Sequence, residues 1–455
     1  MNIAETFDWI YSLEEKRELL IIEEVTNFED KRKVKKNNSG LHFSLSICNE
    51  SSKLLFIKES RFIIKDDLFE IKIKHYLPET TNFKTQRAKC KAYIFESDKF
   101  NADNNQYFKY FSKIESHFLI SDFINEYSKN INFTHNGIVF KISTCRLTEN
   151  MTNSYLCIVA NQKISFKDFK HYINCIINTI GFLSGYLYKK EEYFFQSEKE
   201  DFLDTNFFYR SQDKRLTTYQ PFTKNPQSYN EFFDEKFKFN KSYKEKFSSS
   251  ISEIQFQKLV ELVYENPKYL SALRMIFGSN KNEAIVEHSV IMVVMEIITK
   301  EVRNKFHSEF IQKELVKEVA LKILLKIKNK ISKNDFEELK NAIECIEPSK
   351  AKNIIDFELA FSSLKINLTE KDKKSLKRRN NIFHGSVLKD YENVNTEEDY
   401  SHLENEYRHH SYKLYGLICK LILKQIDFNG HLLNHSKLYE RNTNIVSGET
   451  YFTKI

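Results

Sequence analysis

Hydrophobic and polar side chains alternate with a period of two through much of the first part of the chain. Such alternation predicts half-buried β-strands, because successive side chains of a strand point to opposite faces of its sheet. The runs that alternate, or that are rich in β-branched and aromatic residues, are 41–47, 69–74, 91–95, 138–142 and 155–159. We therefore predict a mainly β region from residue 40 to about residue 165.

Local signals predict a turn and a helix near the end of this region. His135-Asn136-Gly137 precedes the run at 138–142, and Asn-Gly is a preferred pair for a tight β-hairpin turn. From Phe166 the apolar residues recur at helical spacing, and Gly185 stands where a glycine that ends a helix is expected. The pattern predicts one amphipathic helix that packs against the sheet.

Helical periodicity dominates after residue 250. The predicted helices span 254–266, 268–277, 283–306, 309–331, 334–346, 350–365, 369–384 and 400–427. Thr369-Glu370-Lys371-Asp372 is a capping box for one of them, and Gly385 lies at its expected C-terminal end. The last helix carries a continuous apolar stripe that is typical of a core-facing helix.

These patterns predict an α+β protein with two domains. The β-rich N-terminal domain covers residues 1–195, and an all-α helical bundle covers 251–455. Residues 196–250 form a polar, aromatic-rich connector that contains Pro221 and Pro226. The scarcity of glycine (9) and proline (5) favours long helices over a glycine-rich sandwich.

Composition excludes several classes of function. The 455 residues contain no G-x-G-x-x-G, no G-x-x-x-x-G-K-[ST] and no G-x-S-x-G motif, so dinucleotide, P-loop and hydrolase interpretations have no support. The seven cysteines are scattered and never form C-x-x-C, which favours free thiols over disulfides or zinc. We also see no signal peptide and no membrane-length apolar run. We expect a cytoplasmic protein without a metal or other cofactor.

The strongest candidate site is Arg378-Arg379-Asn380-Asn381-Ile382-Phe383-His384-Gly385. An arginine can bind a phosphate bidentately, and a histidine that titrates near neutrality can move the proton of a ribose 2′-hydroxyl. The spacing itself is weak support, because Arg303-Asn304-Lys305-Phe306-His307 has similar letters in an ordinary helix. On a regular helix, side chains five positions apart also point about 140° apart, so convergence needs a helix end or a second copy.

A basic run leads into this candidate site. Its lysines and arginines are Lys371, Lys373, Lys374, Lys377, Arg378 and Arg379. Like charges at these spacings repel each other on a helix unless a partner neutralises them, and an RNA backbone would do so. We therefore predict RNA binding by Lys373, Lys374, Lys377 and Arg378, against the alternative of a solvated helix face.

The segment Arg379-Asn380-Asn381-Ile382-Phe383-His384 resembles the RNxxxH signature of HEPN-domain ribonucleases. The likeness covers about 345–435, and the β-rich half joined to it is similar in architecture to ApeA-type anti-phage proteins of bacteria. The resemblance implies a metal-independent endoribonuclease toxin of antiviral defence, or abortive infection, that acts as a homodimer and cleaves RNA, with transfer RNA as a candidate substrate. It implies that His384 is the general acid or base, that Arg379 stabilises the phosphorane and that Asn380 holds the phosphate. A phage-derived trigger would activate the enzyme, and either Glu287 or Glu296 would assist catalysis.

Three alternatives remain beside this interpretation. Asp67, Glu70 and Lys72 follow a metal-nuclease pattern, but surface charge on a strand explains them better. A set of polar residues in the last helix offers metal-ligand chemistry, although we expect a solvated surface there: His402, Glu404, Glu406, His409 and His410. The alternative function is a non-catalytic HEPN-type module that binds RNA or a protein partner.

Overall fold

The structure is a computed structural model that describes the chain from Asn2 to Ile455 with internal gaps. The residues that it does not describe, besides Met1, are 16, 24–27, 38–39, 47–61, 66–69, 83–86, 115–117, 119, 121–122, 125–129, 147–152, 213–215, 223–249, 281, 307–312, 329–330, 345–352, 378–391, 393, 441–442 and 444. The chain forms two compact units. The first comprises Met1–Gln220 and Ser250–Asn266, and the second comprises Pro221–Ser249 and Pro267–Ile455.

Six antiparallel strands of the first unit close into a barrel. They are β1 (Arg17–Glu23), β2 (Phe28–Asn37), β3 (Gly40–Ser46), β4 (Phe62–Lys65), β5 (Glu70–Asn82) and β6 (Arg87–Ser97). They follow the order β3-β2-β1-β4-β5-β6, and β3 also pairs with β6, so no edge remains open between them. Alternate side chains such as Leu19 and Ile21 on β1 and Ile71 and Ile73 on β5 are buried and belong to the core.

The same sheet continues from β6 into six further strands. They are β7 (Tyr107–Ile114), β8 (Ile131–His135), β9 (Ile138–Cys145), β10 (Ser154–Ala160), β12 (Glu191–Ser197) and β13 (Asn206–Ser211), in the order β13-β12-β7-β10-β9-β8. Two short strands, β11 (Tyr186–Leu187) and β14 (Leu216–Thr217), pair separately. The antiparallel register places Phe194 opposite Tyr110 and Phe195 opposite Lys109.

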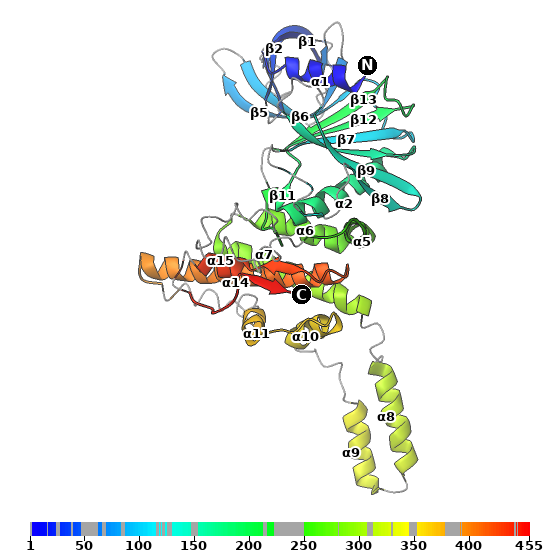
Figure 1. The fold of residues 1–455 in the computed structure, drawn as a ribbon, viewed down its shortest axis with the longest axis vertical. Helices are drawn as coiled ribbons and strands as arrows, with labels where there is room; N and C mark the ends of the chain where they lie inside the picture. The colour runs from blue at the N-terminus through cyan, green and yellow to red at the C-terminus, as the bar shows by residue number, and fades with distance from the viewer. Residues whose placement is uncertain are drawn as a thin grey trace, which may run out of the picture. The chain divides into compact units, whose positions relative to one another are not determined.

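Two helices cover opposite faces of this extension (Figure 1). On α1 (Ile3–Ser12), the Phe7 ring lies 4.7 Å from the Tyr193 ring and 5.3 Å from the Phe195 ring, measured between centroids. On α2 (Phe166–Ser184), the Phe166 ring lies 5.4 Å from that of Phe194, which points the other way from β12. Strand β12 is therefore buried on both faces, and its polar residues must find partners inside the protein: Glu191, Glu192, Gln196 and Ser197.

Adjacent glutamates on β12 form separate buried contacts. Lys36 Nζ on β2 donates a hydrogen bond to Glu191 Oε1 at 3.2 Å, and both side chains are fully buried. Glu192 accepts a hydrogen bond from the Tyr110 hydroxyl at 2.9 Å and pairs with Arg210. Each carboxylate therefore has a cationic partner, as a charge away from water requires.

The local predictions in this unit are confirmed. Asn136 and Gly137 have φ angles of 49° and 77°, the left-handed values of a tight hairpin turn between β8 and β9. Helix α2 ends at Ser184, and Gly185 has a φ of 75°, as a glycine at this position allows. Five of the cysteines are free thiols in the described part of the chain: Cys90, Cys145, Cys157, Cys175 and Cys419.

The structure differs from the predicted domain boundaries. Strand β13 lies in the segment 196–250 that we expected to be a connector, and β12 already crosses residue 195. Helix α5 (Glu253–Glu265) belongs to the first unit rather than to the helical one. The pairing of β13 with β6 explains why the connector was predicted wrongly, because this contact links segments that are far apart in sequence.

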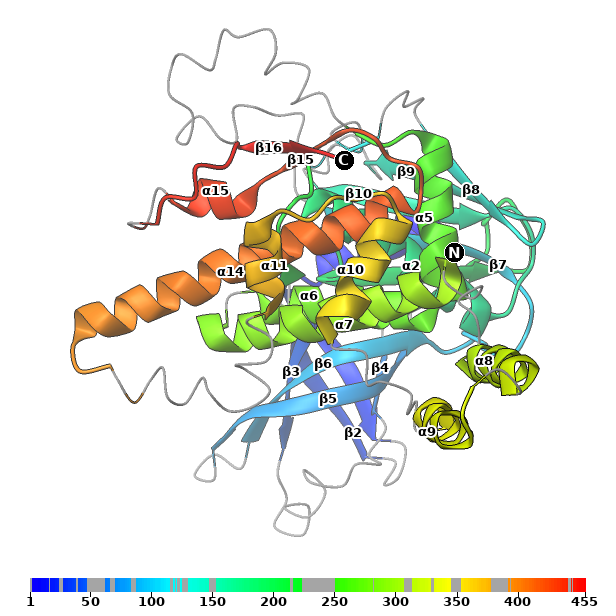
Figure 2. The same cartoon turned by 90° about the horizontal axis from the view of Figure 1, so that it is seen from below.

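The second unit is helical. Its helices are α6 (Pro267–Ser279), α7 (Ala284–Phe306), α8 (Lys313–Ile327), α9 (Lys333–Glu344), α10 (Asn353–Ser363), α11 (Glu370–Lys377), α14 (Glu397–Lys424) and α15 (His435–Tyr439), with β15 (His431–Leu433) and β16 (Phe452–Lys454) near the C-terminus. Figure 2 shows α14 alongside α7, with α10 and α11 nearby, and these helices make direct contacts. The predicted α+β class, with a β-rich region before a helical one, is confirmed, but the second unit is not all-α as predicted, because β15 pairs with β16. Within the described ranges, no helix is long and apolar enough to cross a membrane.

Candidate functional site

The predicted site divides at the end of α11. Lys373, Lys374 and Lys377 lie on this helix, whereas Arg378, Arg379, Asn380 and His384 fall outside the described residues. Arg378 is the residue directly after the last residue of α11. The placement of α11 therefore fixes where the candidate catalytic segment begins.

The start of α11 has the reciprocal cap that the sequence predicts. Asp372 N donates a hydrogen bond to the Thr369 hydroxyl at 3.1 Å, and Thr369 N donates one to Asp372 Oδ2 at 2.9 Å. These bonds satisfy two backbone N–H groups at the beginning of the helix. The capping box is confirmed, with aspartate in the place of the usual glutamate.

The lysines of α11 have different surroundings. Lys373 Nζ lies 3.4 Å from carboxylate oxygens of both Glu358 and Glu370, and the Glu358 contact raises the pKa of Lys373. Lys374 and Lys377 are exposed, lie three positions apart and have no ion-pair partner within the described residues. Lys371 is exposed as well and contacts a carbonyl oxygen rather than a carboxylate, so three lysines of α11 keep positive charge available to an RNA backbone.

The opposite face of α11 is fixed to α14 by polar contacts. Asp372, which is 1% exposed, lies 2.9 Å from Lys413 Nζ. Burial alone would raise the pKa of Asp372, but Lys413, Lys420 and the Thr369 amide outweigh it and lower the pKa. One turn further on, the Ser375 hydroxyl hydrogen-bonds to His410 Nδ1 at 3.0 Å.

A second set of polar contacts joins α14 to α7. Arg408 Nη1 donates a hydrogen bond to Glu287 Oε2 at 3.3 Å, and the Ser411 hydroxyl lies 3.3 Å from His288 Nδ1. Glu404 accepts a hydrogen bond from Ala284 N at 3.2 Å, at the first turn of α7. Because residue numbers rise together in these pairs, α7 and α14 run in the same direction here.

We call the residues that make these contacts the polar seam. It comprises Glu287, His288, Ser375, Arg408, His410 and Ser411, and the imidazole rings of His288 and His410 lie 6.3 Å apart. The seam thus connects α7, α14 and α11, the helix that precedes the candidate catalytic segment. Its imidazoles, hydroxyl groups and carboxylate are groups that can donate or accept protons.

The structure distinguishes between Glu287 and Glu296, the two carboxylates that the sequence offered as accessory residues. Glu287 is 1% exposed and belongs to the polar seam, whereas Glu296 lies on α7 more than two turns further along and is half-buried. No sequence pattern around Glu287 distinguishes it from Glu296 as the candidate accessory residue. Its pairing with Arg408 depends on two helices more than a hundred residues apart in sequence.

The expectation of a solvated surface in the last helix is wrong for two histidines. His402 is exposed, but the His409 and His410 side chains are only 13% and 12% exposed. Glu440 from the C-terminal segment lies 3.6 Å from His409 Nε2. Burial lowers the pKa of His409, and the Glu440 carboxylate opposes this effect without reversing it. No pattern near these histidines indicates that the C-terminal segment covers this face.

The residues of the metal-nuclease pattern, Asp67, Glu70 and Lys72, are only partly described by the structure. Lys72 pairs with Asp98 at 2.5 Å, as expected for surface charge on a strand, while Asp67 lies outside the described residues. In the part of the chain that the structure describes, no group of three or more His, Cys, Asp or Glu side chains has the arrangement of a metal site.

Comparisons of the chain with protein-family models, with curated proteins and with solved structures found no match.

Proposed function

We propose that this protein is a metal-independent endoribonuclease of the HEPN type that acts as a toxin in antiviral defence. The observation that carries the proposal is the arrangement of α11. Its inner face is fixed to α14 through Asp372 and Ser375, while its outer face leaves Lys374 and Lys377 exposed directly before the R-N-x-x-x-H segment. A fixed helix with an exposed basic face is suited to placing an RNA backbone beside that segment.

The chemistry follows from the residue types in the segment. His384 accepts the proton of a ribose 2′-hydroxyl, and the resulting oxygen attacks the adjacent phosphorus atom. Arg379 binds the equatorial oxygens as negative charge develops on the phosphorane, and Asn380 holds the phosphate in position. The P–O5′ bond then breaks, so the products carry a 2′,3′-cyclic phosphate and a free 5′-hydroxyl. A second imidazole, from the other copy of a homodimer, would protonate the leaving 5′-oxygen.

The homodimer is part of the proposal, and α8 offers one apolar surface for it. Val319, Ile323 and Leu325 are 46%, 56% and 61% exposed. Val319 and Ile323 are four positions apart and lie on the same helix face. The β-rich unit would select the RNA or respond to a phage-derived trigger.

The test compares induced wild-type protein with His384→Ala and with the control His402→Ala, which alters an exposed histidine of α14. We expect wild-type and His402→Ala proteins to stop growth and to cleave small RNA, including transfer RNA, in the presence of EDTA. General acid–base catalysis contributes about 10²- to 10⁴-fold, so His384→Ala should lose nearly all cleavage. Cleavage by His384→Ala at the wild-type rate, with or without phage infection, contradicts the proposal.

The second candidate function is RNA binding without cleavage, which the exposed Lys374 and Lys377 would also support. Both functions predict that Lys374→Ala and Lys377→Ala weaken RNA binding. Each lysine that no longer neutralises a phosphate should make the slope of log affinity against log salt shallower by about 0.7 on single strands. Salt-sensitive binding that His384→Ala leaves intact, with no cleavage by any variant before or after infection, would favour this second function.

A further inference from the structure

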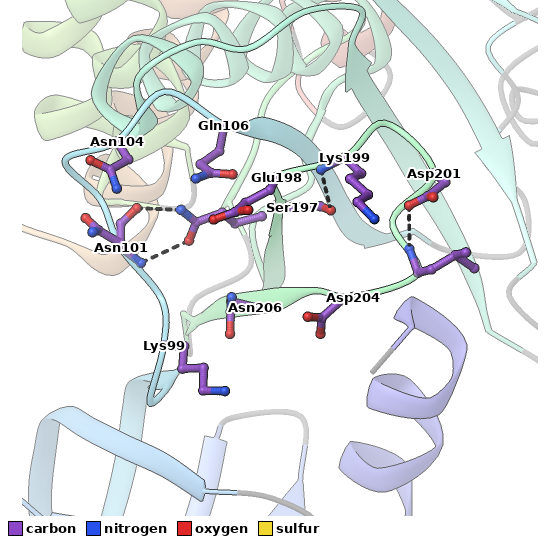
Figure 3. A pocket seen from close by; sticks show the side chains of 12 residues that line it. Lys99, Asn101, Asn104, Gln106, Ser197, Glu198, Lys199, Asp201, Asp204 and Asn206 are labelled. Carbon is purple, nitrogen blue, oxygen red and sulfur yellow. Dashed lines mark hydrogen bonds between the residues drawn. The ribbon is translucent and has the colours of Figure 1, made fainter.

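A polar pocket of about 450 Å³ lies in the first unit, where strands β6, β7, β12 and β13 end (Figure 3). Its volume is in the range of pockets that bind small molecules. The buried side chains that line it are Gln106, Gln196 and Ser197, at 8%, 3% and 4% exposure. Exposed charged and amide side chains surround these at the rim.

The two glutamines have contrasting hydrogen bonds. Gln196 Nε2 donates to Asn101 O at 2.6 Å, and Gln196 Oε1 accepts from Asn101 N at 3.0 Å. The Gln106 side-chain oxygen is buried and has no hydrogen-bond partner within the described residues. A buried carboxamide oxygen without a hydrogen-bond donor is unfavourable in a folded protein unless a ligand supplies that donor. Gln196 therefore has a structural role that Gln106 lacks.

The loop between β12 and β13 supplies much of the rim, and one residue in it adopts a strained conformation. Phe202 has a φ of 56°, in the left-handed region that non-glycine residues rarely adopt. The ring is buried at 3% exposure, with Lys109 Nζ 4.1 Å from its centroid. This anchoring fixes the neighbouring Asp201 and Leu203, both of which line the pocket.

The chemistry of the lining indicates the class of ligand. A carboxamide presents a donor and an acceptor side by side, the pattern that matches the N6 and N7 edge of adenine. Lys199 on the β12–β13 loop carries positive charge suited to a phosphate, while Lys99 lies on the opposite side of the pocket. The Glu198 and Asp201 carboxylates can accept hydrogen bonds from ribose hydroxyls. One ligand that combines these groups is a purine nucleotide.

We propose that this pocket binds an adenine nucleotide, with Gln106 contacting the base and Lys199 contacting the phosphate. The site lies entirely in the β-rich unit and does not depend on the proposed nuclease activity. It would give this unit a small-molecule ligand of its own.

The test is calorimetric titration of the full-length protein with AMP, adenosine and inorganic phosphate. We expect AMP to bind more tightly than either fragment. Gln106→Leu should weaken both AMP and adenosine by about tenfold or more. Lys199→Ala should weaken AMP alone. Lys99→Ala, on the opposite side of the pocket, and Lys141→Ala, which alters an exposed lysine outside it, should each have little effect.

Thermal unfolding separates a ligand contact from a structural role. Leucine at position 106 removes an unpaired polar group, so Gln106→Leu should keep or raise the melting temperature of the free protein. Gln196→Leu breaks two hydrogen bonds and should lower it. No binding of AMP at millimolar concentration overturns the proposal. So does AMP binding that Gln106→Leu and Lys199→Ala leave unchanged, since that ligand would then occupy another site.

Discussion

Strand β12 and the polar seam bury charged groups in different ways. The Lys36–Glu191 pair has no solvent exposure on either side chain, and Tyr193 adds a hydrogen bond to the same carboxylate at 3.1 Å. In the polar seam, Glu287 is equally buried, but its partner Arg408 keeps 29% of its side-chain surface exposed. The first arrangement is closed to water and to ligands, whereas the second reaches the surface of the helical unit.

The difference indicates separate roles for the two regions. A sealed ion pair cannot contact a substrate, so its consequence is for folding: it holds β2 and β12 together, two strands that do not pair with each other in the sheet. The polar seam joins α7, α14 and α11 and reaches solvent at Arg408. Substitutions in the pair on β12 are therefore expected to change stability alone, whereas substitutions in the polar seam test both stability and the proposed activity.

The largest expected effect is at β12. Glu191→Ala leaves the Lys36 ammonium group buried without its carboxylate, which should reduce the free energy of unfolding by about 3–5 kcal/mol. Urea denaturation measures the loss, and Glu200→Ala, at an exposed position nearby, should change stability by less than about 0.5 kcal/mol. The double variant Lys36→Met/Glu191→Leu removes both charges and should recover most of the loss. If Glu191→Ala is as stable as wild type, Lys36 and Glu191 do not form the buried ion pair described above.

An intermediate effect is expected at the polar seam. Arg408→Ala leaves the Glu287 carboxylate buried with fewer donors, and the loss should be about 2 kcal/mol because water can reach the space that Arg408 vacates. In the background Glu287→Gln, the same change should cost less, since no charge is left unpaired. The difference between the two losses is the coupling energy between Arg408 and Glu287, which a double-mutant cycle by urea denaturation measures.

Glu287→Gln also tests the role assigned to the polar seam. The amide keeps the shape of the side chain, so melting temperature should change little. If the carboxylate assists the proposed RNA cleavage, the rate should fall more than the stability does. Equal activity of Glu287→Gln and wild type would assign this residue to structure alone.

The smallest effect is a pH dependence at Asp372. Its pKa is lowered in the folded protein, so its ionised form stabilises the fold at every pH above the ordinary carboxyl value. That contribution is lost as pH falls below about 4 and through the lowered pKa. Asp372→Asn should therefore reduce stability at neutral pH, with a smaller difference from wild type in acid. Glu397→Gln, at an exposed position, is the control. A difference that stays constant with pH would contradict the assigned ion pair with Lys413.

The correct predictions from the sequence concern elements that depend on residues close to one another along the chain. The turn at Asn136-Gly137, the end of α2 at Gly185 and the cap at Thr369 each depend on residues within a few positions of one another. The strand β2 had no such signal, because its sequence Phe28–Asn37 is rich in charge and only alternate residues such as Val34 face the core. His409 and His410 were misplaced for a similar reason, as nothing near them in sequence indicates the segment that covers them.

The sequence by itself thus determined the α+β class, the tight turn at Asn136-Gly137, the cap at Thr369 and the basic run before His384. The tertiary structure decided the closure of β3 on β6, the pairing of Lys36 with Glu191, the position of Glu287 beside Arg408 and the unpaired carboxamide of Gln106. The physical reason is the range of the interactions. Backbone propensity and capping act over a few residues, whereas strand pairing and charge burial join segments whose separation along the chain leaves no pattern to read.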